Sequence, residues 1–188
     1  SDEIYDRLIF DDEPLSLLTY PEIADRLIVL NGWSKTYAMT GWRLGYGIWP
    51  KHLVDYADRM AVNIHSCVNA PTQHAGIAAL TGDQSCVADM LTAFKRRGAL
   101  ITSLLNGIDK VSCQAPGGAF YAFANISQTN IAALDFQQMA LEDYGVALIA
   151  GTSFGGFGEG YVRISCANSD EAISQACARI DTLVRERS

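Results

Sequence analysis

The sequence predicts an α/β protein, in which short apolar strands are combined with amphipathic helices. Two runs, residues 27–30 and 43–49, have the length and the apolar character of strands. Between residues 50 and 105 the apolar side chains instead recur at helical spacing. Beyond Gly107 the chain returns to short strands and turns. With 188 residues, 49% of them hydrophobic and 19% charged, it can bury a sizeable core as one or two domains.

Three helices are predicted in the middle of the chain. The first begins after Pro50 and ends near residue 61, and the second runs from about residue 71 to residue 80. Asp83 follows a break and can cap the third and longest helix, which is expected to end near residue 105. Residues 95–97 of that helix are all basic, and they predict a solvated face.

The last part of the chain predicts a smaller α+β region. Strands are expected at residues 111–114, 119–123, 146–150 and 161–165. A helix is expected at residues 134–144. The glycine-rich loop at residues 152–160 is interpreted as a mobile rim, because it lacks the G-x-G-x-x-G spacing of a dinucleotide site. Asn168 and Glu171 are interpreted as the capping pair of the last helix.

Charge and composition exclude several classes of function. A net charge of −7 without a basic segment argues against nucleic-acid binding. No apolar run approaches the length that spans a bilayer, so no membrane partner is expected. The five cysteines lack C-x-x-C spacing, and the three histidines have no carboxylate-rich partner set, so no metal site is predicted. Scattered, unpaired cysteines are typical of a reducing compartment, and the cytoplasm is the expected location.

The stretch from residue 31 to residue 46, NGWSKTYAMTGWRLGY, breaks the apolar periodicity. The ammonium of Lys35, the guanidinium of Arg43 and the hydroxyl of Ser34, with glycines that allow close backbone approach, can form a cradle for a phosphate. Lysine is also the side chain that forms Schiff bases with aldehydes such as pyridoxal phosphate. The alternative is that Lys35 and Arg43 are ordinary solvated loop charges.

The pattern S-K-T-x-x-x-x-G-x-R, from Ser34 to Arg43, resembles the cofactor-attachment signature of the class I/II aminotransferases, which use pyridoxal 5'-phosphate (PLP). The resemblance covers essentially the whole chain and is greatest to the aspartate and aromatic aminotransferase branch. It implies a fold-type I PLP-dependent transferase. Because intact members are considerably longer, the chain is expected to be the carboxy-terminal half. Residues 1–88 would belong to the mixed sheet of the large PLP-binding domain, and residues 89–188 would form a linker helix and the small carboxy-terminal domain.

The resemblance implies a role for each residue of the cofactor site. Lys35 would hold PLP as a Schiff base and would then move the substrate α-proton. Ser34 and Arg43 would anchor the phosphate. Asp2 would keep the pyridine nitrogen protonated, and Tyr5 would hydrogen-bond the ring oxygen.

Arg163 lies in a run of residues, YVRIS, that is otherwise largely apolar. A guanidinium in such a setting needs a partner anion, because a buried unpaired charge is costly. The resemblance implies that this anion is the substrate α-carboxylate. An internal ion pair with an Asp or Glu is the alternative.

The expected function is PLP-dependent transamination between an amino acid and a 2-oxo acid, by an enzyme whose full-length form is a homodimer. Two alternatives remain open. The first is a carbon–sulfur lyase or a synthase of the same fold, since these enzymes share the same residues. The second is a non-catalytic fragment that acts as a folding or interaction module. The identity of the substrate side chain is not readable from these residues.

Overall fold

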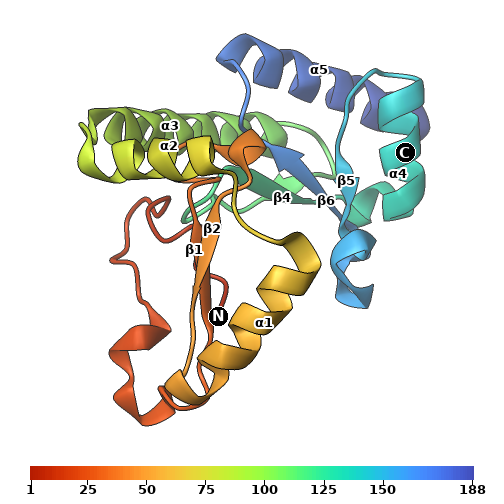
Figure 1. The fold of residues 1–188 in the computed structure, drawn as a ribbon. Helices are drawn as coiled ribbons and strands as arrows, with labels where there is room; N and C mark the ends of the chain where they lie inside the picture. Colours follow the sequence, from red (N-terminus) through yellow and green to blue (C-terminus); the bar gives the residue numbers. More distant parts are fainter. The chain divides into compact units, whose positions relative to one another are not determined.

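The computed structural model describes all residues from Ser1 to Ser188, and the chain divides into two compact units. Unit 1 is Ser1–Leu91 and unit 2 is Thr92–Ser188. Helix α3 (Ser85–Asn106), which is labelled in Figure 1, contains the boundary. The sequence placed this boundary between residues 88 and 89, within the same helix. None of the helices is both long and apolar enough to cross a membrane.

Unit 1 is built on a small mixed sheet. Strands β1 (Val29–Gly32) and β2 (Gly45–Ile48) pair antiparallel. On the other edge of β1 the first residues of the chain run parallel to it, and Asp2 forms a bridge with Leu30. The amide and the carbonyl of Leu30 both bond to the backbone of this segment, at 2.8 Å each. The strand expected at residues 27–30 therefore lies two residues further along the chain.

Gly32 and Gly45 bring β1 and β2 unusually close. A Cβ atom at Gly32 would lie 2.8 Å from the carbonyl oxygen of Leu44 and 2.9 Å from the Cα atom of Gly45. Both of these are backbone atoms, so any side chain at Gly32 would push the strands apart. The close approach fixes the base of the loop that joins the two strands, and this loop carries Lys35.

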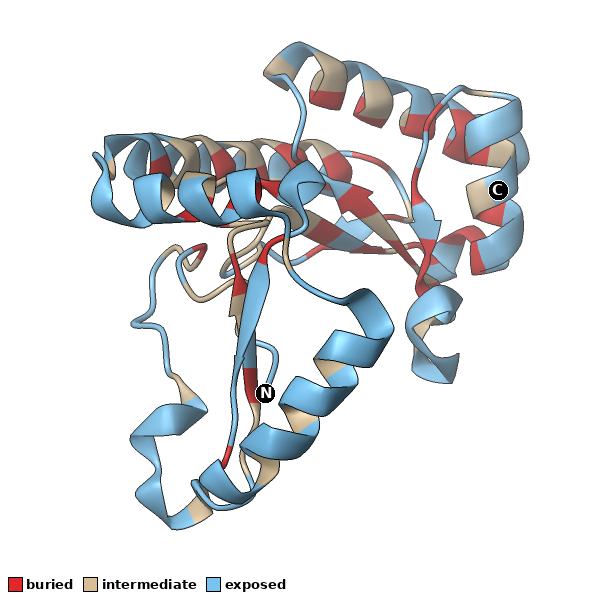
Figure 2. Cartoon of the chain, in the orientation of Figure 1, coloured by how far each residue is buried: buried red, intermediate tan, exposed pale blue.

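A proline precedes the first helix of unit 1, and an asparagine side chain caps the second. Pro50 precedes a short 3-10 turn and then α1 (Val54–His65), which ends four residues later than expected. Helix α2 (Ala70–Thr81) begins at Asn69, whose side chain accepts a hydrogen bond from the amide of Thr72. None of the residues of α1 is buried, as Figure 2 shows in pale blue and tan.

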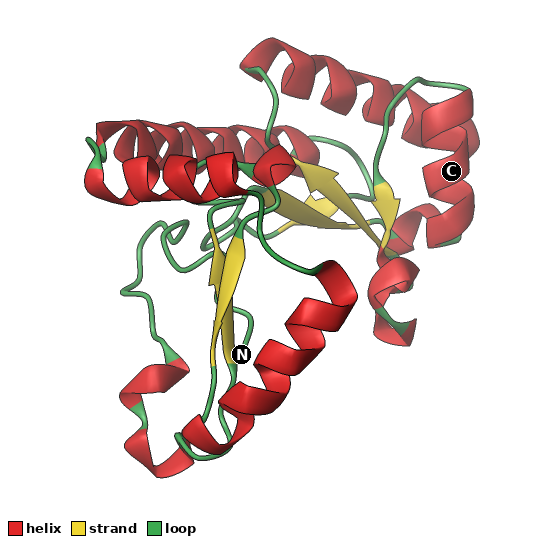
Figure 3. Ribbon diagram, in the orientation of Figure 1, coloured by secondary structure: helices red, strands yellow, loops and turns green.

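Unit 2 contains a four-stranded antiparallel sheet in the order β3-β4-β6-β5. The strands are β3 (Ser112–Cys113), β4 (Tyr121–Asn125), β5 (Ile149–Ala150) and β6 (Tyr161–Ser165). All four overlap the predicted runs, and β6 has the predicted bounds. Figure 3 shows these strands together with α4 (Ala133–Glu142) and α5 (Asp170–Arg187).

The two faces of this sheet differ because side chains alternate along a strand. Ala122 and Ala124 of β4 are buried with Val162 and Ile164 of β6. They form the core of unit 2 with residues of the helices, namely Ile101, Leu105, Phe136, Ala140, Ile173, Cys177, Ile180, Leu183 and Val184. The alternate residues of β4 and β6 point to the other face, and one of them is Arg163.

Short 3-10 turns connect the longer elements. They are Leu17–Thr19, Pro21–Ile23, Thr40–Trp42, Lys51–Leu53, Ser127–Thr129, Gly151–Phe154 and Gly156–Gly158. The last two lie in the glycine-rich loop and are called η6 and η7.

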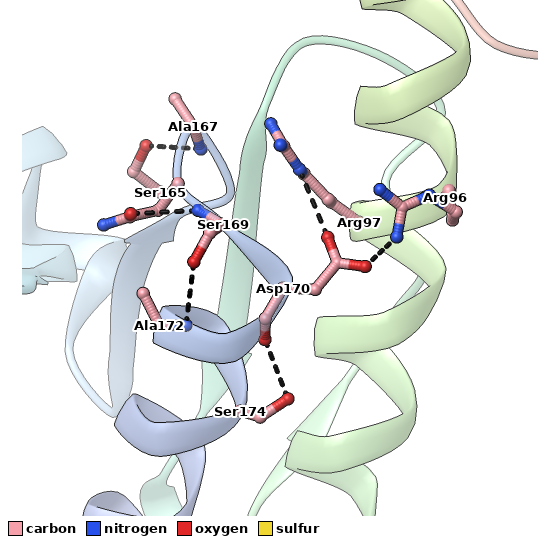
Figure 4. Close-up of polar contacts among 9 residues, drawn as sticks. Arg96, Arg97, Ser165, Ala167, Ser169, Asp170, Ala172 and Ser174 are labelled. Atoms are coloured by element: carbon pink, nitrogen blue, oxygen red, sulfur yellow. Dashed lines mark hydrogen bonds and ion pairs between the residues drawn. The ribbon is translucent and has the colours of Figure 1, made fainter.

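The start of α5 differs from the prediction. Ser169 is the capping residue, because its hydroxyl accepts a hydrogen bond from the amide of Ala172 at 3.2 Å (Figure 4). The predicted cap, Asn168, is therefore wrong by one position. Arg96 and Arg97 of α3 were expected only to form a solvated face. The structure shows that both pair with Asp170 in the first turn of α5 (Figure 4).

Candidate functional site

Lys35 lies in a tight turn that follows β1. The amides of Tyr37 and Met39 both donate to the carbonyl of Trp33, at 3.2 and 3.4 Å. The indole nitrogen of Trp33 donates in turn to the carbonyl of Gly76 at 3.1 Å, which ties the turn to α2. The backbone that carries Lys35 is therefore held from within the turn and from a neighbouring helix.

Tyr5 and Lys35 are brought together by this arrangement. The Nζ atom of Lys35 lies 5.7 Å from the centre of the Tyr5 ring, within the range of a cation–π contact. Both side chains are half-buried. The segment that carries Tyr5 is itself turned, since the amide of Leu8 donates to the carbonyl of Tyr5 at 2.9 Å.

Asp2 is placed by its pairing with β1. Its side chain is exposed, and one carboxylate oxygen accepts a hydrogen bond from the amide of Ile4 at 3.2 Å. No basic side chain of the chain pairs with this carboxylate. The bridge to Leu30 fixes the backbone of Asp2, and its carboxylate is open to a ligand.

Arg43 lies at the other end of the lysine loop. Its backbone has a left-handed conformation, with φ of 55°, and one Nη atom donates to the carbonyl of Thr40 at 2.7 Å. The side chain borders an open cavity of about 820 Å³, whose lining includes Gly41, Asn69 and Thr72. No carboxylate pairs with the guanidinium, so its remaining N–H groups can bind an anion from this cavity.

Ser34 is half-buried, and its hydroxyl has no hydrogen-bond partner within the chain. No polar contact joins Ser34 or Arg43 to Lys35, and neither Ser34 nor Lys35 lines the cavity beside Arg43. The structure thus brings Tyr5 and Lys35 into contact and places Arg43 beside a cavity. The groups themselves, an amine, a hydroxyl and a guanidinium with unused donors, suit a phosphorylated aldehyde.

Two side-chain hydrogen bonds are made by residues in and next to the lysine turn, and the sequence did not predict them. The side chain of Asn31 donates to Asp6 at 3.0 Å, and the hydroxyl of Tyr37 donates to Gln84 at 3.1 Å. Burial, with the nearby negative charges of Asp6 and Glu3, raises the pKa of Tyr46. The only signal in the sequence was the position of Asn31 beside the motif.

Arg163, in unit 2, contacts two aromatic rings. The central carbon of its guanidinium lies 4.2 Å from the centre of the Tyr121 ring and 4.3 Å from that of Phe154. Phe123, the cross-strand partner of Arg163, stacks on Tyr161 at 5.1 Å. No carboxylate pairs with Arg163, so the internal ion pair that was the alternative is not formed.

Tyr121 and Phe154 were missed as partners of Arg163. Tyr121 and Arg163 both point to the same face once the register of β4 and β6 is known, since Tyr121 is opposite Ser165. That register cannot be predicted from the sequence, because it depends on the pairing of two distant strands. Phe154 was predicted only to lie in the glycine-rich loop, which was expected to be mobile.

The chain resembles known aminotransferases along its whole length. The family model described as Aminotransferase class I and II matches residues 1–180. An aspartate aminotransferase of Streptomyces avermitilis is 38% identical over 197 residues, covering 99% of this chain and 48% of that protein. An aspartate aminotransferase of Pyrococcus abyssi is 35% identical, covering 100% of this chain and 49% of that protein.

Solved structures give the same result. An aromatic aminotransferase from Pyrococcus horikoshii has a TM-score of 0.94 and 34% identity, covering 100% of this chain and 51% of that one. An aspartate aminotransferase from Thermotoga maritima has a TM-score of 0.87 and 34% identity, covering 98% and 47%. The chain spans about half the length of the relatives it matches. Its assignment to the carboxy-terminal half stays a prediction from the order of the motifs.

Proposed function

The chain belongs to the class I and II aminotransferases and has their fold-type I architecture, and on this premise we propose that it carries the lysine and the carboxylate-binding arginine of a PLP-dependent transaminase. The reaction would exchange an amino group between an amino acid and a 2-oxo acid. The observation that carries the proposal is the half-buried amine of Lys35, held by a tight turn against the Tyr5 ring.

PLP, when bound, supplies a ring that accepts electrons from the substrate α-carbon. Lys35 would be the amine that attaches it, and the same amine would then take and return the proton at the α-carbon. A positioned base of this kind typically contributes about 10²–10⁴-fold in rate. The carboxylate of Asp2, which no basic side chain neutralises, would hold a proton on the ring nitrogen.

Phosphate binding is proposed for Ser34 and Arg43. The hydroxyl of Ser34 and the unused N–H groups of Arg43 are the donors available in this loop. A guanidinium binds phosphate through paired N–H groups, which gives orientation as well as charge. Tyr5 would donate its hydroxyl to the ring oxygen of the cofactor from its place beside Lys35.

Substrate binding is proposed for Arg163. Its guanidinium makes no ion pair and no hydrogen bond within the chain, while the rings of Tyr121 and Phe154 contact it. A carboxylate can bind the guanidinium as a fork through two parallel hydrogen bonds. The α-carboxylate of an amino acid or a 2-oxo acid has this shape.

Two further expectations remain proposals. A cytoplasmic location is favoured by the five unpaired cysteines, which are typical of a reducing compartment. Assembly of the full-length protein as a homodimer is supported by family membership alone.

Reductive trapping tests the proposal. PLP is added to the chain, the adduct is reduced with borohydride, and the labelled lysine is mapped by peptide mass spectrometry. Label is expected at Lys35 and lost in Lys35→Arg, whereas Lys51→Arg and Lys110→Arg keep it, since neither of these lysines lies in the lysine turn. Label on Lys51 or Lys110 but never on Lys35 would overturn the assignment.

The chain is expected to label weakly by itself, because it spans about half of a relative. Labelling is therefore repeated with the chain joined to the remaining half of the Streptomyces avermitilis relative, where stronger label on Lys35 is expected. Product analysis on this longer protein separates transamination from the alternatives. A keto acid with pyridoxamine phosphate indicates a transaminase, whereas ammonia with pyruvate indicates a carbon–sulfur lyase.

A further inference from the structure

Arg163 is held by aromatic rings rather than by hydrogen bonds. The rings of Tyr121 and Phe154 lie 4.2 and 4.3 Å from the carbon of its guanidinium. Contact with a ring occupies the flat face of a guanidinium and leaves the N–H groups at its edge unused. The two rings therefore restrict the orientation of Arg163 without competing for the donors that a carboxylate needs.

The two rings come from different kinds of structure. Tyr121 is in β4, and its backbone is fixed by pairing with Ser165 of β6. Phe154 ends the short turn η6 in the glycine-rich loop, and 53% of its surface is exposed. The position of Phe154 therefore depends on how this loop is held.

The loop is anchored at both ends to α4. The amide of Ala150, just before the loop, donates to the side chain of Gln137 at 2.6 Å. At the far end, the side chain of Glu159 accepts a hydrogen bond from the amide of Ala133 at 2.8 Å. The N-cap residue of α4 is an alanine, which has no side chain that can accept a hydrogen bond. Glu159, which is distant in the sequence, therefore caps the amino end of α4.

Glycines close the base of the loop. A Cβ atom at Gly151 would overlap the carbonyl oxygen of Gly158, so the two backbones are in direct contact. With its base closed and its ends bonded to α4, the loop presents Phe154 against Arg163. The loop that was expected to be only a mobile rim thus has a defined structural partner.

From this geometry, and resting on the function proposed above, we infer that Phe154 is a positioning residue for substrate binding. Its ring holds the guanidinium of Arg163 in the orientation in which the edge N–H groups receive a carboxylate. A leucine at this position keeps apolar bulk but loses the ring, so Arg163 samples more rotamers before it binds. The expected effect is a rise in the Kd of a carboxylate ligand of roughly 3–10-fold.

The loop supplies a matched control. Phe157 lies three residues further on, is fully exposed, and makes no ring contact with Arg163. Phe157→Leu therefore makes the same chemical change in the same loop without touching the guanidinium. Phe154→Tyr keeps a ring over Arg163 and serves as the conservative rescue.

The test uses the full chain with ¹⁵N-labelled arginine. Pyruvate is titrated while the Nε–H signal of Arg163, assigned by its loss in Arg163→Lys, is followed by NMR, and pyruvamide serves as the probe without a carboxylate. Saturable binding of pyruvate is expected in the unsubstituted chain and in Phe157→Leu. Phe154→Leu should bind roughly 3–10-fold more weakly, with a signal broadened by rotamer exchange, and Phe154→Tyr should restore both.

The outcomes separate the inference from the proposed function. If pyruvate does not shift the Arg163 signal, or binds Arg163→Lys equally well, the carboxylate site itself fails, and with it that part of the proposed function. If Arg163→Lys loses binding but Phe154→Leu matches the unsubstituted chain, only the inference is overturned. Equal weakening by Phe154→Leu and Phe157→Leu would show a general effect of the loop, and this also overturns it.

Discussion

The amine of Lys35 and the ring of Tyr5 lie 5.7 Å apart, although thirty residues separate them along the chain. The contact forms because residues 1–3 pair with β1, and β1 leads directly into the lysine turn. One edge of a short sheet thus fixes both partners. This arrangement allows the contact to be tested without the cofactor.

Replacing Tyr5 by leucine should lower the free energy of unfolding, because Lys35 loses its cation–π contact. The loss is expected to be at least about 0.5–1 kcal/mol, with lost ring packing added to it. Tyr5→Phe keeps the ring and should lose less stability than Tyr5→Leu. Urea unfolding followed by circular dichroism measures both, and equal losses in the two variants would contradict a role for the ring.

Gly32→Ala is expected to destabilise the chain by about 1–3 kcal/mol. The new Cβ atom would meet backbone atoms at 2.8 and 2.9 Å, and backbone cannot rotate away as a side chain can. Gly41→Ala is the control, since a Cβ atom there meets nothing within 4 Å. Thermal unfolding should show a lower Tm for the first variant and little change for the second; the reverse order would disprove the tight contact between β1 and β2.

The cysteines should fall into two classes of reactivity. Cys67 and Cys86 are exposed, whereas Cys113, Cys166 and Cys177 are buried in unit 2. Burial raises the pKa of Cys166 and of Cys177 to about 11, so both remain thiols at pH 8. A thiol reagent such as DTNB should react quickly with two cysteines in the folded chain and with all five after denaturation; rapid reaction of more than two would contradict the burial.

The same thiols predict how stability depends on pH. In the unfolded chain a cysteine ionises near its ordinary pKa of about 8.5, while in the folded chain Cys166 and Cys177 keep their protons to about pH 11. The unfolded state therefore binds fewer protons over this range, and the free energy of unfolding should fall as the pH rises from about 8.5 to about 11. Cys166→Ala with Cys177→Ala should flatten this slope in urea unfolding measured at several pH values, and an unchanged slope would assign the effect to other groups.

Asp170→Asn should destabilise the chain by about 0.5–1 kcal/mol. The variant removes the pairing of Arg96 and Arg97 with the first turn of α5, together with a favourable charge at the amino end of that helix. The loss should shrink at high salt, because these groups are partly exposed and are screened. Urea unfolding at low and at high salt measures the difference, and a loss that is independent of salt would point to packing instead.

Strand and helix positions were predictable where the pattern was local. Residues 161–165 alternate cleanly, and β6 has those bounds. The apolar run at residues 27–30 was less informative, because β1 is placed by the approach of Gly32 to Gly45, which depends on a partner strand. Asn168 and Ser169 can both cap a helix, and only the folded backbone selects Ser169.

The candidate site was predictable to the extent that its residues follow one another in a motif. Ser34, Lys35 and Arg43 share one loop, and their spacing singled them out. The rings around Arg163 could not be found in this way. Tyr121 requires the register of β4 with β6, and Phe154 requires the closed loop base, so both depend on contacts between residues distant in the sequence.

The pairing of the first residues with β1 has a consequence for how the position of the reactive amine can be monitored. The amide hydrogen of Leu30 is bonded to the carbonyl of Ser1, so it should exchange with deuterium only when this three-residue edge detaches. Its exchange rate then reports how often the strand leading into Lys35 loses its outer neighbour. The exchange rate of this one amide hydrogen therefore measures how often the strand before the lysine loop is disrupted.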